Sequence, residues 1–162
     1  MTVLGIDPGP VTSHWALFDG AMASGGSFIN TMYRTSVQSS HPYGDDWYGA
    51  RFLHVAIEKV ASYGMPVGAE VFETVFWSGR MYEWYGGCPA RVSRPTRKEI
   101  VTHICGSARA KDSNVRQALI DRIGAPGLKK SPGPTFGIKG DQWQALACSV
   151  YAWDKLMEDA RG

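Results

Sequence analysis

The sequence predicts an α/β fold in which helices flank a mixed five-stranded sheet, with three antiparallel strands followed by parallel ones. Three observations predict it: strand-like segments fill the first third of the chain, strands and helices alternate in the middle, and helical patterns fill the end. The 162 residues have the length of one ordinary domain, and neither a linker nor a repeat divides them. We therefore expect a single domain over residues 1–162.

The first third is predicted to be an antiparallel meander. Residues 2–7 form an apolar strand, His14–Phe18 form a second strand, and residues 23–33 form a third strand after the Asp-Gly turn at 19–20. Side chains alternate between the two faces of a strand, so that Asp7 lies at the tip of the first one and points away from Leu4 and Ile6. The alternative interpretation is that Asp-Pro-Gly at 7–9 is ordinary turn chemistry.

Helices and strands are expected to alternate through the middle of the chain. After a loop over 36–44, the predicted elements are a helix from Asp45 or Asp46 to Gly64, a strand over 67–73, a helix over 77–85 and a strand over 90–92. The first helix is predicted from the helical spacing of Phe52, Val55 and Ala56.

Helices are expected to fill the last third of the chain. They span Arg97–Cys105, Asp112–Ile123 and about Asp141–Ala160, and a Gly-, Pro- and Lys-containing loop over 124–137 precedes the last one. In that last helix, Leu146, Val150 and Trp153 lie on one apolar stripe, which indicates packing against the sheet.

Charge is distributed unevenly, although the net charge is only +2. Residues 1–90 carry four Lys or Arg against eight Asp or Glu, whereas residues 91–130 carry ten Lys or Arg against three acids. A basic block beside an acidic block is what a polyanion-binding surface around a cation site needs. The alternative is a solvated helix face without a partner.

Cysteine usage and hydropathy indicate a cytoplasmic protein, in the host cytoplasm if it is phage-encoded. Cys88, Cys105 and Cys148 are odd in number, widely spaced and without a metal-binding pattern, as expected for free thiols in a reducing compartment. No segment approaches the roughly 20 apolar residues of a membrane span, and no signal-peptide pattern opens the chain.

Carboxylates from distant segments are candidates for a metal site. Asp7 ends the first strand, Glu70 and Glu73 lie on opposite faces of the predicted strand 67–73, and Asp141 precedes the last helix. Converging carboxylates raise each other's pKa unless a cation neutralises them, and an all-oxygen set favours Mg²⁺ or Mn²⁺. Each residue also has an ordinary interpretation: Asp141 is a good helix N-cap, and one of the two glutamates is a solvated strand residue.

These motifs together resemble a known family. Leu4 to Gly9, Phe72 to Phe76, Lys98 to Lys111, and Gly140 to Ala147 occur in the same order as in the RuvC family of Holliday-junction resolvases, and most resemble its phage-type members. The resemblance covers nearly the whole chain. It implies a ribonuclease-H-like fold and a Mg²⁺-dependent endonuclease, with Mn²⁺ as a substitute, that cleaves branched DNA and leaves 5′-phosphate and 3′-hydroxyl ends.

The resemblance also implies site residues. Asp7, Glu73 and Asp141 match acidic metal ligands, with Glu70 in reserve for the strand glutamate, and Lys111 matches a basic catalytic residue. Phe76 matches an aromatic that stacks in the opened junction, with core packing as the alternative. The remaining candidate DNA contacts, each of which has solvated surface as its alternative, are Arg94, Arg97, Lys98, Arg109, Lys111 and Arg116.

Two departures from the family pattern are visible. Gln144 stands where the family has a second C-terminal acid, so the site has one negative charge fewer. The predicted helix 77–85 is short for the family's dimer, which leads us to expect a homodimer with an altered interface.

Two rival interpretations stay open: a non-catalytic protein that binds branched DNA, and an actin- or Hsp70-like ATPase, for which the chain lacks room for a second domain. Flaps, forks or hybrids are alternative substrates within the nuclease class.

Overall fold

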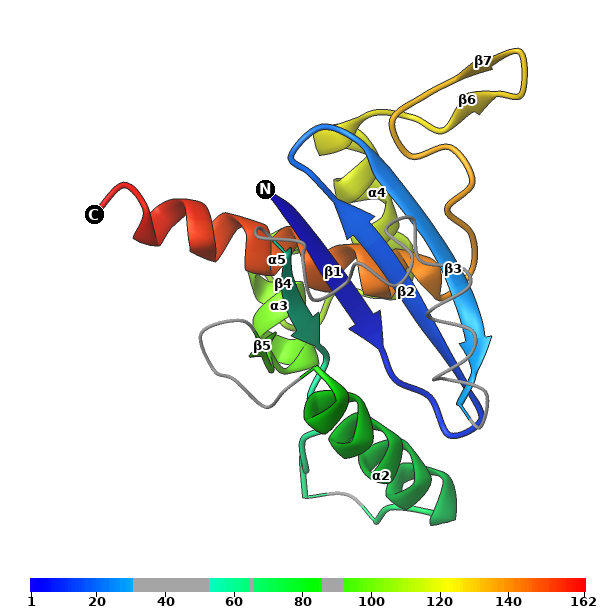
Figure 1. Ribbon diagram of the computed structural model, residues 1–162, viewed down its shortest axis with the longest axis vertical. Coiled ribbons are helices and arrows are strands. Elements are labelled where there is room, and N and C mark those ends of the chain that lie inside the picture. The colour runs from blue at the N-terminus through cyan, green and yellow to red at the C-terminus, as the bar shows by residue number, and fades with distance from the viewer. Residues whose placement is uncertain (31–52, 65, 86–91) are drawn as a thin grey trace.

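A five-stranded mixed sheet forms the centre of the molecule (Figure 1). The computed structural model describes residues 1–30, 53–64, 66–85 and 92–162. The strand order is β3-β2-β1-β4-β5, and only the pairs β1–β4 and β4–β5 are parallel. The strands are β1 (Thr2–Asp7), β2 (Thr12–Phe18), β3 (Ala23–Ile29), β4 (Leu53–Ile57) and β5 (Val92–Ser93). The predicted fold class is confirmed.

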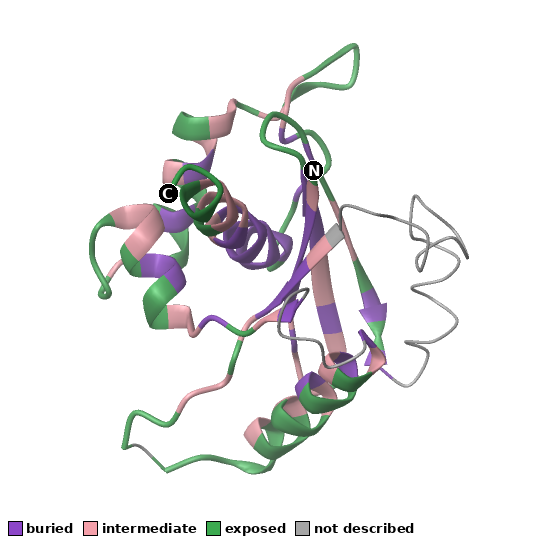
Figure 2. Ribbon diagram, turned by 60° about the vertical axis from the view of Figure 1, so that its left-hand side comes forward, coloured by how far each residue is buried: buried purple, intermediate pink, exposed green. Residues whose placement is uncertain are grey.

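Helices cover both faces of this sheet, as the two apolar clusters show (Figures 1 and 2). On one face, Val3 and Ala56 pack with residues of α3, α4 and α5. On the other face, Leu4 and Ile6 pack with Met81 of α2. The helices are α2 (Ala69–Trp84), α3 (Arg97–Cys105), α4 (Asp112–Ile123) and α5 (Gln142–Asp159), and a small hairpin of β6 (Gly127–Leu128) and β7 (Ser131–Pro132) lies between the last two. Among the described helices, none has the length and hydropathy needed to cross a bilayer.

A partly exposed ion-pair cluster joins the three helices on the first face. Asp154 of α5 lies 2.6 Å from Nε2 of His103 in α3 and accepts a hydrogen bond of 2.6 Å from Nη1 of Arg122 in α4. Burial alone would raise the pKa of Asp154, but the hydrogen bonds from Arg122 and His103 outweigh it and hold that pKa below its ordinary value. The cluster therefore fixes the three helices relative to one another.

Gly5 lets α5 lie directly on β1. A Cβ at this position would be 2.1 Å from the carbonyl oxygen of Ala145 and 2.6 Å from the backbone nitrogen of Ser149. Both neighbours are backbone atoms of a fully buried part of α5, so they cannot move aside independently.

We expect Gly5→Ala to destabilise the fold by about 3 kcal/mol, because the extra methyl group would push α5 away from the sheet. The matched control is Gly79→Ala in α2, where a Cβ would meet nothing within 4 Å and the free energy of unfolding should rise by roughly 0.5–1 kcal/mol. Urea denaturation measures both. An unchanged midpoint for Gly5→Ala would contradict the close packing of α5 on β1.

The middle of the chain differs from the predicted order. Residues 53–57 are a strand instead of part of a helix, since Val55 and Ile57 face one apolar cluster while Ala56 faces the other. The predicted strand 67–73 and helix 77–85 are instead one helix, α2. A short apolar run fits the period of a helix as well as that of a strand. Because β4 is buried on both faces, it lacks the apolar and polar alternation that would have identified it as a strand.

The other predicted boundaries agree more closely with the structure. The helices at 97–105, 112–123 and about 141–160 are confirmed. The loop 124–137 contains the β6–β7 hairpin, and β5 begins at Val92. Four predicted features lie outside the described residues: the start of the first helix at 45 or 46, the start of the strand at 90, the end of the third strand at 31–33, and Cys88.

Candidate active site

Asp7 and Glu58 lie side by side at the carboxyl ends of two parallel strands. Asp7 is the last residue of β1, and Glu58 directly follows β4. The register pairs Ile6 with Ile57, and the backbone N–H of Glu58 donates to the carbonyl oxygen of Ile6 at 2.9 Å. Both carboxylates therefore follow their strands at the same edge of the sheet, and Asp7 lies on the face that α5 covers.

Asp141 and His14 extend this group toward α5. Asp141 occupies the N-cap position of α5, but its side chain makes no capping hydrogen bond and is 72% exposed. Its Oδ2 lies 3.6 Å from Nε2 of His14, which is paired with Asp7 across β1 and β2. Asp141 thus occupies the predicted N-cap position, but its side chain does not cap the helix.

The carboxylates act on one another electrostatically. Burial, followed by the charges of Glu58 and Asp141, raises the pKa of Asp7 to about 8, against a weaker opposing effect of Arg97. Burial likewise raises the pKa of Glu58, while Arg97 lowers it. Burial and the neighbouring carboxylates therefore make the ionised form of Asp7 costly without a counter-ion, and a bound cation would offset that cost.

Arg97 is the cation that the protein itself supplies to this site. It opens α3 after the N-cap Thr96, which forms a capping box with Glu99. Its Nη1 donates to Oε1 of Gln144 at 3.1 Å, and its Nη2 pairs with Asp112 at the start of α4. Gln144 is 7% exposed. Gln144, the neutral residue at the position where an acid was expected, is thus buried and held by Arg97.

A cleft of about 300 Å³ opens beside Asp141. The start of α4, the segment before α5 and the start of α5 form its walls. Arg116 lines it with its guanidinium 5.5 Å from the ring centroid of Trp143, and Lys139 lines it from the segment before α5. Cations in a cleft next to carboxylates can hold a phosphate group near a metal ion.

The oxygen donors suit a hard divalent cation, but they do not already form a coordination shell. Asp7, Glu58 and Asp141 provide the all-oxygen set that Mg²⁺ or Mn²⁺ prefers. Within the described ranges, however, no three His, Cys, Asp or Glu side chains converge closely enough to hold a metal ion. The chemistry of the donor set fits a metal, and the exposed Asp141 is the side chain with most freedom to approach it.

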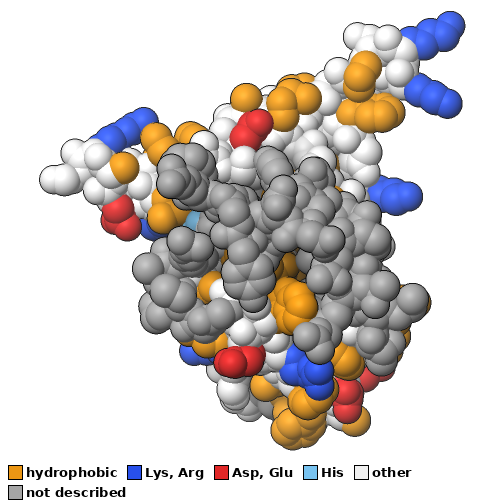
Figure 3. Space-filling view, in the orientation of Figure 1, with side chains coloured by type: hydrophobic (Ala, Val, Ile, Leu, Met, Phe, Trp, Pro, Cys, Tyr) orange, Lys and Arg blue, Asp and Glu red, His pale blue; other side chains and the backbone are white. Residues whose placement is uncertain are grey.

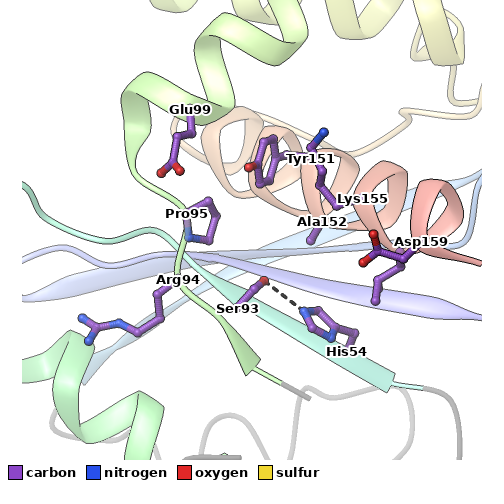
Figure 4. Close-up of a pocket in the computed structure, with 10 residues that line it drawn as sticks. His54, Ser93, Arg94, Pro95, Glu99, Tyr151, Ala152, Lys155 and Asp159 are labelled. Carbon is purple, nitrogen blue, oxygen red and sulfur yellow. Dashed lines mark hydrogen bonds between the residues drawn. The ribbon is translucent and has the colours of Figure 1, made fainter. Parts of the chain in front are cut away.

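A larger pocket, of about 480 Å³, lies at the other end of α5 and lacks such a set (Figure 4). His54 and Ser93 share a hydrogen bond of 2.9 Å there, while Glu99 caps α3 and Lys155 pairs with Glu158. Arg94 points away from the pocket in Figure 4 and stacks on Tyr82. Because these charged groups are engaged elsewhere, the smaller cleft is the better candidate site.

Comparison with solved structures identifies the fold. A structure of Thermus thermophilus RuvC matches with a TM-score of 0.57 and 18% identity over 98% of this chain and 97% of that one. T. thermophilus RuvC in complex with Holliday junction substrate matches with a TM-score of 0.63 and 20% identity, over 98% of this chain and 96% of that chain. The chain has a RuvC-like fold. No protein-family model and no curated protein matches the sequence.

Within this RuvC-like fold, the strand glutamate next to Asp7 is Glu58, not Glu70 or Glu73. Both of the latter are exposed on α2, so their predicted placement on a fourth strand is wrong. Neither is among the charged groups that shift the pKa of Asp7, whereas Glu58 is. The signal missed in the sequence was the acid that directly follows Val55-Ala56-Ile57, because that segment was interpreted as helical.

The predicted DNA contacts divide between the two faces of the RuvC-like fold. Arg97 and Arg116 lie at the carboxylates and their cleft, and Lys111 is the exposed N-cap residue of α4, next to Asp112. Lys98 and Arg109 are exposed at α3 and just after it. Arg94 and Phe76 instead contact α2 residues on the other face, where Arg94 donates to Ser78 and Phe76 packs edge-on against Trp77.

Proposed function

We propose that this protein is a metal-dependent endonuclease that cleaves Holliday junctions or other branched DNA. The observation that carries the proposal is that Asp7 and Glu58 end neighbouring parallel strands at one edge of a RuvC-like fold. Asp141 is near enough to raise the pKa of Asp7, and it borders a cleft lined with Arg116 and Lys139. One of the structures with this fold was solved in complex with Holliday junction substrate. The subfamily that we propose is the phage-type one.

The residues that would hold Mg²⁺, or Mn²⁺ in its place, are Asp7, Glu58 and Asp141. A bound divalent cation supplies an acidified water and stabilises charge on a phosphodiester. Arg97, held by Gln144, keeps a fixed positive charge beside the carboxylates and would bind the phosphate, and Lys111, which directly precedes Asp112, would assist it. Hydrolysis of this kind leaves a 5′-phosphate and a 3′-hydroxyl.

Two aromatic residues are candidates for stacking on unpaired bases. Phe76 is exposed on α2, next to Trp77 and Arg80. Tyr63, which is 61% exposed, follows Glu58 by only five residues and is thus tied to the site by a short piece of chain. We propose Tyr63 as the alternative to Phe76, because base stacking needs an open aromatic face near the catalytic carboxylates.

We also propose that the protein is a homodimer, because cleavage of two opposed strands requires two sites related by a two-fold axis. The outer face of α2 exposes Phe72, Val75 and Phe76, an apolar stripe at helical spacing. The helix has 16 residues, so the expectation of a short dimer helix was wrong.

The proposal is tested by cleavage of end-labelled synthetic DNA. We expect a four-way junction to be cut in Mg²⁺ or Mn²⁺ but not in EDTA, with 5′-phosphate ends that a ligase can rejoin. Flaps, forks and linear duplexes in the same series define the substrate preference. Tight binding of junctions without cutting in either metal would favour the rival function, a non-catalytic DNA-binding protein. The neutral side chain of Gln144 is the observation that favours this rival.

A further inference from the structure

The β6–β7 hairpin projects from the body of the molecule (Figure 1). Gly127 pairs with Pro132 and Leu128 with Ser131, so that Lys129 and Lys130 form the tip. Leu128 is 75% exposed, and both lysines are exposed. The hairpin packs nothing against the core, and its tip therefore adds little to the stability of the fold.

The base of this hairpin is nevertheless built rigidly. The fully buried Thr135 donates from Oγ1 to the carbonyl oxygen of Gly124 at 2.8 Å. The N–H of Ala23, at the start of β3, donates to the carbonyl oxygen of Pro134, also at 2.8 Å. Gly133 donates to Pro126 at 2.8 Å. These bonds and three prolines fix the direction of an arm whose tip is basic, which lowers the entropy cost of binding through that tip.

The charge of this segment points to a polyanion. Residues 122–140 contain no Asp or Glu. In the part of the chain that the structure describes, neither Lys129 nor Lys130 forms an ion pair. In Figure 3, the side chains in the Lys and Arg colour at the hairpin tip stand out from the surface, and the only such residues in the hairpin are lysines. Exposed lysines without acidic partners attract phosphate groups at little desolvation cost.

The hairpin is connected to the candidate active site by α4. This helix begins in the site with Asp112 and ends at Ile123, and residues 124–126 connect it to the hairpin. Twelve helical residues span about 18 Å, which equals the axial length of roughly five base pairs. Arg116 and Lys139 line the cleft at the near end, so that basic groups are present at both ends of this distance.

We propose that the β6–β7 hairpin is a second DNA contact, in which Lys129 and Lys130 bind the phosphate backbone of one duplex arm more than about five base pairs from the cleaved bond. This inference rests on the proposed function, because it assumes that the cleft takes DNA. The carboxylates and the cleft act on the branch point, whereas the hairpin binds the arm that leaves it.

The test is the arm-length dependence of binding. Four-way junctions with arms of about 5 and about 15 base pairs are titrated by fluorescence anisotropy in EDTA over a range of salt concentrations. We expect Lys129→Ala/Lys130→Ala to weaken binding of the long-arm junction about tenfold and to reduce its salt slope by about two, with the short-arm junction unaffected. Far-UV circular dichroism and thermal unfolding should match those of the wild type.

The matched control is Lys155→Ala/Arg161→Ala, which removes two positive charges from the opposite end of α5 and should leave both affinities unchanged. A hairpin variant with the wild-type arm-length dependence and salt slope would overturn the inference while leaving the proposed function intact. Failure of the wild type to bind any junction would instead overturn the proposed function itself.

Discussion

Asp7→Asn should lower the rate of junction cleavage in Mg²⁺ by at least about 10³-fold. Asp7 is the carboxylate on which Glu58, Asp141 and Arg97 all act, and an amide cannot supply the charge that a divalent cation needs. Binding of the junction in EDTA at neutral pH should be kept, because the pKa of Asp7 is raised to about 8 and the amide therefore replaces a carboxyl that is already largely uncharged without metal. Rates come from single-turnover cleavage of a labelled junction.

The same variant has a stability readout that is independent of cleavage. In the folded protein the pKa of Asp7 is raised to about 8, so this residue contributes stability at low pH that is lost as the pH rises from about 4 through 8. Asp7→Asn should remove that loss and be more stable than the wild type at pH 8 by about 2–5 kcal/mol in metal-free buffer. Parallel urea curves at pH 5 and pH 8 measure the effect. A fully active variant, or one with the wild-type pH dependence of stability, would contradict the role and the surroundings assigned to Asp7.

Glu58→Gln should reduce cleavage to a similar extent, whereas Glu73→Gln should leave it within about twofold of the wild type. Glu58 is half-buried beside Asp7 at the end of a parallel strand, while Glu73 is exposed on α2 on the other side of the sheet. Both changes are isosteric and remove one negative charge, so each controls for the other.

Single-turnover rates at saturating Mg²⁺ decide between the two glutamates, and thermal unfolding shows whether each variant is folded. Loss of cleavage in Glu73→Gln together with an active Glu58→Gln would mean that the carboxylates next to β1 are not the catalytic set. It would also restore the original interpretation of the segment Phe72 to Phe76.

Local signals in the sequence determined much of this protein. The alternation of Leu4 and Ile6 with Gly5 and Asp7 predicts a strand that carries an acid at its end, and the structure agrees. Local signals also predict α3, α4 and α5, because helical patterning and the glycines and prolines that end it act between residues close in the chain. Asp141 was placed at the start of α5 for the same reason.

Only the tertiary structure decided which residues meet Asp7. Glu58 becomes its neighbour through the parallel pairing of β1 with β4, and Arg97 reaches Gln144 because α3 and α5 pack on the same face. Pairing between distant segments leaves no periodic trace in a single sequence, and a short apolar strand buried on both faces has the same composition as a helix. The acidic partner of Asp7 was therefore assigned to the wrong glutamate until the register of the sheet was known.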